Sequence, residues 1–209
     1  MIERAYSIAS SPHEDQLEFF VELVPDGELT PLLYRLNVGD TVSVRRAAKG
    51  RFLADMTAAP TDHLFLCTVT GVAPFLSLVR TLARDWREGA FKGDQRLFLI
   101  QGASRSSEFG YRDEIERFAR ELPWLTYVPT VSRRWEDPDW TGETGRVDDV
   151  IRKYADQWFP EPSHPMAHLC GHPAMIEHAK AILGRRGWPK ERLKEESYFV
   201  LPPEHRHAS

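Results

Sequence analysis

The stretch HLFLCTVTGVAPF, residues 63–75, predicts how most of this chain folds. Residues 63–67 are mostly apolar and have the length and composition of a buried strand. Small residues follow, and Pro74 is placed to begin a helix. A strand that enters a helix through such a loop turns backbone N–H groups and the positive end of the helix dipole toward an anion, which suits a phosphate or pyrophosphate. Ordinary strand–helix connections have the same pattern, so this segment alone leaves both interpretations open.

The rhythm of strand, turn and helix repeats through the rest of the chain. Further strands are predicted at residues 96–100, 125–129 and 166–170, and helices at residues 74–86, 111–122, 147–158 and 173–186. This alternation is typical of βαβ units, which build a parallel sheet with helices on both faces. Such sheets bind ligands at the carboxyl ends of their strands. The residues at those ends include Cys67, Gly71, Gly102, Cys170 and Gly171.

The first sixty residues follow a different pattern. Short strands are predicted at residues 6–10, 17–23 and 41–45, which together make a small antiparallel β unit. One short helix is expected after Thr30, which can serve as its N-cap, with Pro31 at the first helical position. The boundary is expected at residues 58–62, so that residues 1–58 form one module and residues 59–209 an α/β Rossmann-like module.

Composition excludes several classes of function. The chain has 209 residues, 42% of them hydrophobic and 28% charged, with a formal net charge of -4. This balance predicts neither a nucleic-acid partner nor a membrane partner, and without a signal-peptide segment the expected location is the cytoplasm. Two cysteines are too few for a Cys₄ iron–sulfur or zinc site, and the histidines show no metal-ligand spacing, so no metal site is expected. Redox chemistry would require a bound organic cofactor.

Two further segments carry side chains suited to a nucleotide. Arg4 can hold a diphosphate, and Tyr6, on the same face of a strand, can stack on an aromatic ring. Near the other end, Cys170 and Gly171 end a strand, and Gly171 allows a flat ring or sugar to approach closely. Each segment also has a plain structural interpretation: an exposed strand of mixed polarity for the first, and a strand–helix connection with a buried cysteine for the second.

The motifs taken together, in order, resemble the bacterial ferredoxin/flavodoxin–NADP⁺ reductases. They are Arg4-Ala5-Tyr6-Ser7, Pro25-Asp26-Gly27 before Leu29-Thr30, Thr68-Val69-Thr70-Gly71 before Ala73-Pro74, Val131-Ser132-Arg133, Thr144-Gly145-Arg146, Cys170-Gly171 before Pro173 and Met175, and Glu195-Glu196-Ser197-Tyr198-Phe199. The resemblance extends from about Arg4 to Phe199. It implies an antiparallel Greek-key β-barrel that holds FAD, followed by the Rossmann-like NADP-binding module. Because Arg4 stands so early, the barrel is expected to be partial, without its first strands.

The resemblance also assigns residues to FAD. It places Arg4 at the pyrophosphate, Tyr6 against the flavin and Ser7 near the reactive nitrogen of the flavin. The residues expected along the adenosine half are Phe20, Val21, Glu22 and Leu23. Those expected at the pyrophosphate turn are Glu28, Leu29 and Thr30.

A second set of residues is assigned to NADP(H) and to the reaction. Thr70 and Gly71 border both cofactors. The resemblance implies that the adenosine 2′-phosphate is read by Ser132, Arg133 and Arg146, and that the nicotinamide side is lined by Cys170, Gly171, Pro173 and Met175. Either Tyr198 or Phe199 covers the flavin and moves aside for the nicotinamide. The candidate catalytic residues are Tyr6, Ser7 and Cys170.

The implied activity is electron transfer between NADPH and ferredoxin or flavodoxin, by hydride transfer to FAD and then single-electron steps, in a monomer. Two alternatives stay open: the reductase component of an oxygenase, and a non-catalytic nucleotide-binding relative without FAD. Val69 departs from the family pattern, which has glycine there, and a β-branched residue does not readily take positive φ. Gln101 replaces a histidine, and Ser104 falls where arginine is common.

A cluster of positive charge lies beside the expected flavin module. Its members are Arg45, Arg46, Lys49 and Arg51. The cluster is a candidate docking patch for an acidic electron carrier, because opposite charge raises the rate of encounter. It is equally compatible with a solvated strand edge that lysine and arginine protect from aggregation.

Overall fold

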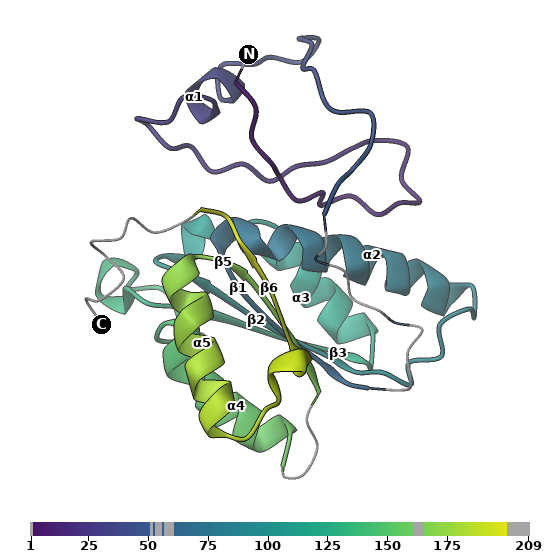
Figure 1. The fold of residues 1–209 in the computed structure, drawn as a ribbon, viewed down its shortest axis with the longest axis vertical. Coiled ribbons are helices and arrows are strands. Elements are labelled where there is room, and N and C mark those ends of the chain that lie inside the picture. The colour runs from purple at the N-terminus through teal and green to yellow at the C-terminus, as the bar shows by residue number, and fades with distance from the viewer. Residues whose placement is uncertain (1, 51, 53–55, 57–60, 161–164, 200–209) are drawn as a thin grey trace.

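The computed structural model describes residues 2–50, 52, 56, 61–160 and 165–199, which form one parallel sheet flanked by helices and a long segment that lies over it (Figure 1). The strands are β1 (His63–Thr68), β2 (Leu97–Ala103), β3 (Leu125–Val131), β4 (Glu143–Thr144), β5 (Met166–Gly171) and β6 (Leu193–Ser197). The α-helices are α1 (Thr30–Leu33), α2 (Ala73–Arg87), α3 (Arg112–Glu121), α4 (Val147–Trp158) and α5 (Pro173–Arg185). Short 3₁₀ turns are η1 (Val69–Val72), η2 (Ser106–Glu108), η3 (Arg134–Glu136) and η4 (Lys190–Arg192). In the described part of the chain no helix is long and apolar enough to cross a membrane.

The sheet has six strands in the order β4-β3-β2-β1-β5-β6, and every pairing is parallel. The four predicted strands are confirmed as β1, β2, β3 and β5. Strand order reverses at β1, which has β2 on one side and β5 on the other, and ligands of open parallel sheets bind at this reversal. The sequence did not predict β4, which has two residues, or β6, a polar strand at the sheet edge.

The four helices predicted after the first module are confirmed, each within two residues of its expected ends. Buried side chains of α2 and α3 pack on one face of the sheet, around Phe65, Leu99 and Phe118. Those of α4 and α5 pack on the other face, around Leu66 and Leu169. The central strands are therefore buried on both sides, which explains why their sequences are continuous apolar runs.

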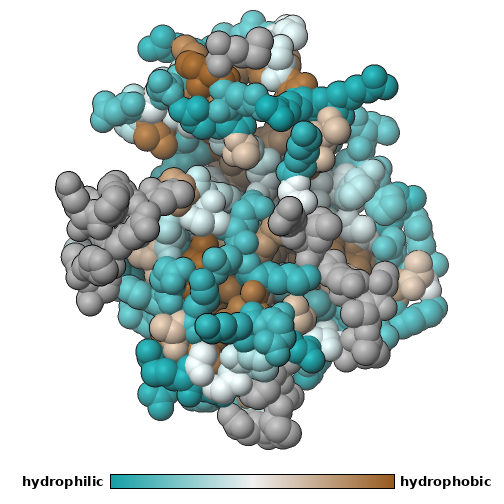
Figure 2. All heavy atoms as spheres, viewed as in Figure 1, coloured by the Kyte–Doolittle hydropathy of each residue, from teal (hydrophilic) through white to brown (hydrophobic). Residues whose placement is uncertain are grey.

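The predicted barrel is not confirmed. Residues 2–50 contain one antiparallel bridge, between Ile8 and Phe19, and the four-residue helix α1, but none of the strands predicted at residues 6–10, 17–23 and 41–45. Most large hydrophobic side chains of this segment are exposed, and Figure 2 shows them on the surface at the top of the view. Apolar residues with strand propensity need neighbouring strands to pair with, and an isolated pair is marginally stable.

Thr30 has a different role from the predicted N-cap. Leu29 precedes α1 without a side-chain cap, and Thr30 is the first residue of the helix, so Pro31 takes the second helical position and not the predicted first. The Thr30 hydroxyl instead accepts the Val24 N–H at 3.0 Å and donates to the Val24 carbonyl at 3.1 Å. Its hydroxyl therefore closes the preceding turn and does not cap the helix.

The N-terminal segment is fixed to α2 through residues 8–20. Ala9 is fully buried in the core beside α2 and α3. The Ser77 hydroxyl donates to the Ser10 carbonyl at 2.7 Å, and the Ser11 and Thr81 hydroxyls lie 3.0 Å apart. Arg80 pairs with carboxylates of this segment and of α3. This docking places residues 2–8 close to the carboxyl ends of the strands.

Candidate active site

The loop that follows β1 packs directly against the loop that follows β5. A Cβ atom on Gly71 would lie 2.4 Å from the Cys170 carbonyl oxygen, so only glycine fits. The Thr68 hydroxyl accepts a hydrogen bond from the His172 N–H at 2.9 Å. The carboxyl ends of the neighbouring strands β1 and β5, at the sheet's reversal point, are thus in direct contact.

Gly171 makes the second close approach. Its φ is +125°, and a Cβ atom there would lie 2.3 Å from the Thr68 hydroxyl. Pro173 begins α5, as the sequence predicts. Met175, assigned to the nicotinamide side, is buried at 5% exposure in the core between α4 and α5, so its side chain supports the site from behind.

Tyr198 bridges the two loops. Its hydroxyl donates to the Thr70 carbonyl at 2.8 Å and accepts from the Cys170 thiol at 3.5 Å. Burial raises the pKa of Cys170 to about 12, so the thiol is protonated and neutral at physiological pH. The next residue, Phe199, packs edge-on against His172 with ring centroids 5.3 Å apart and is half exposed.

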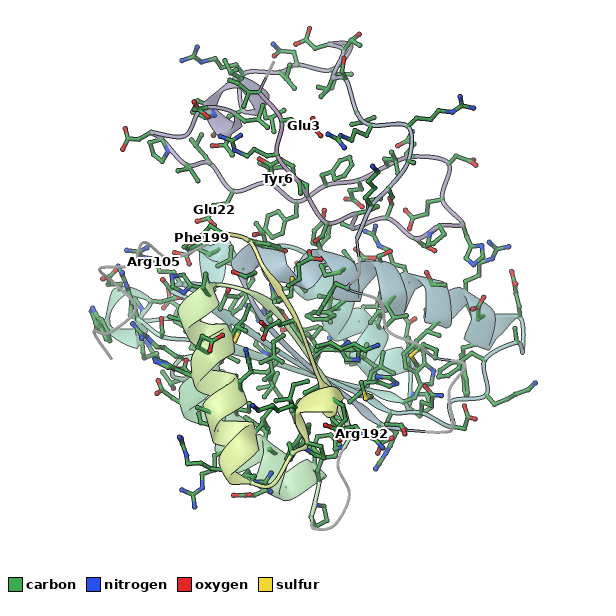
Figure 3. The ribbon with its side chains drawn as sticks, viewed as in Figure 1. Glu3, Tyr6, Glu22, Arg105, Arg192 and Phe199 are labelled. Atoms are coloured by element: carbon green, nitrogen blue, oxygen red, sulfur yellow. The ribbon has the colours of Figure 1, made fainter. Side chains whose placement is uncertain are left out.

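Ser7 connects the N-terminal segment to this cluster. Its hydroxyl donates to the Glu196 carboxylate at 2.6 Å across 189 positions of sequence. Tyr6 is partly buried beside it, and burial raises the pKa of its hydroxyl. Figure 3 shows Tyr6 on the N-terminal segment above the end of β6, where Phe199 follows. The sequence interpretation gave Glu196 no role, although its position beside the terminal aromatic residues was a usable signal.

The remaining residues assigned to FAD divide into two groups. Arg4 pairs with Glu28, so the two elements expected at the pyrophosphate do lie together, next to Leu29 and Thr30. Phe20 instead packs edge-on against Tyr111, with centroids 5.5 Å apart, in a space that only Gly110 leaves open. Beyond Phe20 the chain leaves the core: Val21 is partly buried, and Glu22 and Leu23 are exposed.

The residues assigned to the 2′-phosphate lie at the carboxyl ends of β3 and β4. The N–H groups of Ser132 and Arg133 donate to the Ala103 and Ser104 carbonyls, both at 3.0 Å. Arg146 directly precedes α4, and its N–H donates to Asp149 at 2.9 Å. The connection after β2 brings these residues beside Arg105.

A carboxylate already lies among these arginines. Glu136 pairs with Arg133, with the charged atoms 3.6 Å apart, and also with Arg105. Burial and the nearby Arg146 both lower the pKa of His172, because each disfavours a further positive charge. Two of the arginines at this edge of the sheet, Arg105 and Arg133, therefore already share one carboxylate. Among the described residues, no group of His, Cys, Asp or Glu could hold a metal ion.

Val69 stands where the family pattern has glycine, and its backbone does adopt the positive φ that a β-branched residue does not readily take. Its φ is +43°, in the left-handed region that β-branched residues avoid. Gln101 reaches it: the side-chain amide donates to the Val69 carbonyl at 3.2 Å. The sequence singled out both residues but did not predict that they touch.

Known proteins match this chain in sequence and in fold. Residues 65–181 match the model of the oxidoreductase NAD-binding domain family. The ferredoxin–NADP reductase of Pseudomonas aeruginosa is 33% identical, over 93% of this chain and 80% of the relative. The flavodoxin/ferredoxin–NADP reductase of Escherichia coli is 31% identical, over 84% of this chain and 69% of the relative.

The fold agrees. A ferredoxin NADP⁺ reductase from Neisseria gonorrhoeae, solved with bound FAD and NADP, superimposes with a TM-score of 0.77 at 24% identity, covering 94% of this chain and 80% of that one. The similarity in sequence includes both the sheet and the segment that carries Ser7, and these are the two parts that the Ser7–Glu196 bond joins. The chain therefore belongs to the ferredoxin–NADP reductase family.

Proposed function

We propose that this chain is an FAD-containing oxidoreductase that transfers electrons between NADPH and ferredoxin or flavodoxin. The observation that carries the proposal is one cluster at the reversal point of the sheet. There Ser7 bonds to Glu196, and Tyr198 bonds both to Cys170 and to the loop after β1; Cys170 and Glu196 lie opposite each other on the paired strands β5 and β6. Residues far apart in sequence meet where a parallel sheet binds its ligands.

The residues of the N-terminal segment suit FAD. Arg4 provides a guanidinium beside the turn at Glu28, and guanidinium groups bind diphosphates through paired hydrogen bonds. Tyr6, the neighbour of Ser7 in the chain, and Tyr198, bonded to Thr70 and Cys170, both provide aromatic rings. The exposed apolar side chains of the same segment offer surface for flat rings, and they include Leu23, Val24 and Leu32. We assign FAD to this face of the segment.

The sheet edge suits NADP(H). Gly71 and Gly171 let the loops after β1 and β5 pack directly against each other at the end of the sheet that binds ligands. The Glu136 carboxylate between Arg105 and Arg133 marks a position where a phosphate can replace it. Arginine is well matched to phosphate because its planar fork forms two parallel hydrogen bonds. The 2′-phosphate is the group that separates NADPH from NADH, so we assign the choice of NADPH to Ser132, Arg133 and Arg146.

The side chains of this chain orient and bind. When bound, FAD and NADP(H) supply the hydride and single-electron chemistry. Cys170, neutral because it is buried, presents an uncharged thiol beside Tyr198. Tyr198 must break its bonds to Thr70 and Cys170 if its ring is to leave room for a nicotinamide. Ser7 is held at one rotamer by Glu196, which fixes where its hydroxyl lies.

The partner and the organisation of the chain complete the proposal. Arg46 and Lys49 are exposed, while Arg45 pairs with Glu3, and Arg51 lies outside the described residues. We assign the docking of an acidic carrier to this patch, since exposed positive charge steers such partners.

We also propose a cytoplasmic monomer with an FAD module at residues 1–58 and an NADP module at residues 59–209. The boundary between the two modules falls among residues that the structure does not describe.

Absorbance of the purified protein tests the function. Flavin absorbance, before or after incubation with FAD, and its bleaching by NADPH are the expected results. Ser7→Ala should slow bleaching by roughly tenfold or more, the size of effect expected when a positioned hydrogen-bonding group is lost. Ser77→Ala is the matched control, because it removes a hydroxyl that also joins the N-terminal segment to the NADP module but lies away from the cluster.

The same experiment separates the alternatives. A colourless protein that also fails to take up FAD would identify a nucleotide-binding relative without the reaction. Bleaching by NADPH that Ser7→Ala leaves unchanged would remove Ser7 from the machinery while keeping the enzyme. Transfer from the reduced protein to ferredoxin or flavodoxin, measured at low and high salt, tests the partner, because steering by Arg46 and Lys49 weakens as salt rises.

A further inference from the structure

A strained valine lies in the loop between the two cofactor positions. Val69 has φ +43°, and only one other non-glycine residue of the described chain, Tyr111, has positive φ. A β-branched side chain makes this conformation unfavourable, because Cβ then crowds the following carbonyl group. The surrounding structure must hold Val69 there, since residues in such conformations persist only where other contacts fix them.

A buried pair of side chains supplies one of those contacts. Gln101, on β2, is fully buried, and its amide nitrogen donates to the Val69 carbonyl at 3.2 Å. The Tyr127 hydroxyl, on β3, donates to the amide oxygen of Gln101 at 2.6 Å. The two bonds fix which way the amide points, because only its nitrogen can donate to a carbonyl. A chain of hydrogen bonds thus runs from β3 through β2 to the strained residue.

The contacts on either side of Val69 are different in kind. The Thr68 hydroxyl bonds to the loop after β5, and the Thr70 carbonyl accepts from Tyr198. Tyr198 is the side chain that moves in the proposed function, so its bond to Thr70 is lost whenever the ring leaves. The bond from Gln101 comes from the interior of the sheet and stays in place. It is therefore the contact that can hold the loop while Tyr198 moves.

We propose that Gln101, supported by Tyr127, is a positioning residue that keeps Val69 in its left-handed conformation and so preserves the shape of the loop at residues 68–72 that receives NADP(H). The inference rests on the proposed function for the identity of the ligand. If the proposal is right, Gln101 is needed only because residue 69 is a valine. With glycine at position 69, positive φ carries no penalty, and the loop keeps its shape without the bond from Gln101.

Four proteins test this dependence: wild type, Gln101→Leu, Val69→Gly and the double variant. NADP⁺ is titrated into each by calorimetry, and amide hydrogen exchange of residues 70–73 is measured without ligand. Gln101→Leu should weaken NADP⁺ binding about tenfold, equivalent to about 1.4 kcal/mol, and speed exchange by a similar factor. In the Val69→Gly background the same change should alter either quantity by less than about twofold. Tyr127→Phe should give a smaller loss in the same direction, about threefold.

Matched controls separate positioning from general loss of stability. Gln95→Leu removes another buried glutamine, which lies just before β2 at the opposite end of the sheet, and Tyr154→Phe removes a phenol bonded to Glu143. Both should leave NADP⁺ binding unchanged. Equal losses from Gln101→Leu in both backgrounds would overturn the proposal. If wild type binds no NADP⁺, the proposed function fails, and hydrogen exchange alone still decides whether Gln101 holds the loop.

Discussion

His168 is the residue whose burial has the clearest measurable effect on stability. It is 1% exposed, its Nε2 lies 3.1 Å from His63 Nδ1, and Phe52 and Phe65 pack around it. Burial, with a smaller contribution from His63, lowers the pKa of His168 to about 3. The folded protein therefore keeps this ring neutral at pH values where the unfolded chain protonates it.

The sign of the pH dependence follows. Above about pH 6.5 the ring is neutral in both states, and between there and pH 3 only the unfolded state binds the proton, so stability falls as the pH is lowered. His168 alone should lower the free energy of unfolding by about 2 kcal/mol between pH 7.5 and pH 5. In urea denaturation, the free energy of unfolding of His168→Gln should fall between pH 7.5 and pH 5 by about 2 kcal/mol less than that of the wild type. The exposed residue His13, changed to glutamine, serves as the control; an identical pH dependence in His168→Gln and wild type would contradict the assignment.

Gly71 and Gly184 make opposite predictions for the same substitution. A Cβ atom on Gly71 would collide with the Cys170 backbone, whereas one on Gly184 would meet nothing within 4 Å. Gly71→Ala should therefore destabilise the protein by about 1–3 kcal/mol, and Gly184→Ala, in α5, should stabilise it by about 0.5–1 kcal/mol. Thermal unfolding measures both, and a neutral Gly71→Ala would mean that the two loops are not in contact.

Arg80 matters at the scale of elements, because it fixes the N-terminal segment to two helices. The guanidinium on α2 lies 2.8 Å from Glu114 of α3, 2.5 Å from Glu18 and 3.6 Å from Glu14, and it is 15% exposed. The hydrogen bond from Arg80 lowers the pKa of Glu18, so this carboxylate stays ionised in the fold. Removal of the guanidinium would leave partly buried carboxylates without their partner.

Arg80→Leu should lower the free energy of unfolding by about 2–4 kcal/mol and make residues 2–50 more sensitive to protease. Arg84→Leu, one turn along α2, removes an exposed pair with Glu88 and should change stability by less than about 0.5 kcal/mol. Limited proteolysis followed by mass spectrometry distinguishes release of the segment from global unfolding. If both variants behave alike, Arg80 does not fix the segment.

Elements were predictable where local sequence determines them. The strands β1, β2, β3 and β5 are apolar because helices cover both sheet faces, and glycine and proline mark their ends. The edge strand β6 reads Leu-Lys-Glu-Glu-Ser, and nothing in that pattern reveals that it pairs with β5. The strands predicted in residues 2–50 were wrong for a related reason, since strand propensity does not supply a pairing partner.

The candidate site was predictable in part for the same reason. Thr70, Gly71, Cys170 and Gly171 could be placed together because carboxyl ends of parallel strands share one edge. The contacts that reach across the molecule could not: Ser7 to Glu196, and Gln101 to Val69, join residues 189 and 32 positions apart. The periodicity of the sequence does not predict contacts between residues so far apart, because these contacts depend on how the helices and strands pack together.

At the scale of the molecule, the N-terminal segment and the sheet with its helices differ in how much apolar surface they leave exposed. Most of the exposed large hydrophobic side chains, from Ile2 to Val44, lie in the N-terminal segment, whereas the sheet buries its own. Exposed apolar surface on this scale marks a binding face. The proposed function supplies an occupant for it in FAD.

Addition of FAD should therefore protect residues 21–50 from protease and reduce binding of a hydrophobic dye to the protein, because ligand binding stabilises the form that binds it. Tyr6→Ala should weaken both effects, since Tyr6 lies at the proposed flavin face. Limited proteolysis with and without FAD measures the protection. Trp135→Ala, which removes an exposed aromatic ring outside the N-terminal segment, is the control. Protection that is absent in wild type would contradict the assignment of FAD to this segment.

The Ser7–Glu196 bond has a consequence for how the protein is made. A ribosome adds about 5–20 residues per second, so Glu196 is synthesised roughly 10–40 seconds after Ser7, 189 residues earlier in the chain. Throughout that interval the nascent chain carries one side of the cluster without the other. β1 and β5 can pair before β6 emerges, but the cluster closes only when β6 adds to the edge of the sheet. Assembly of the cluster therefore has to wait until β6 has been synthesised and has added to the sheet.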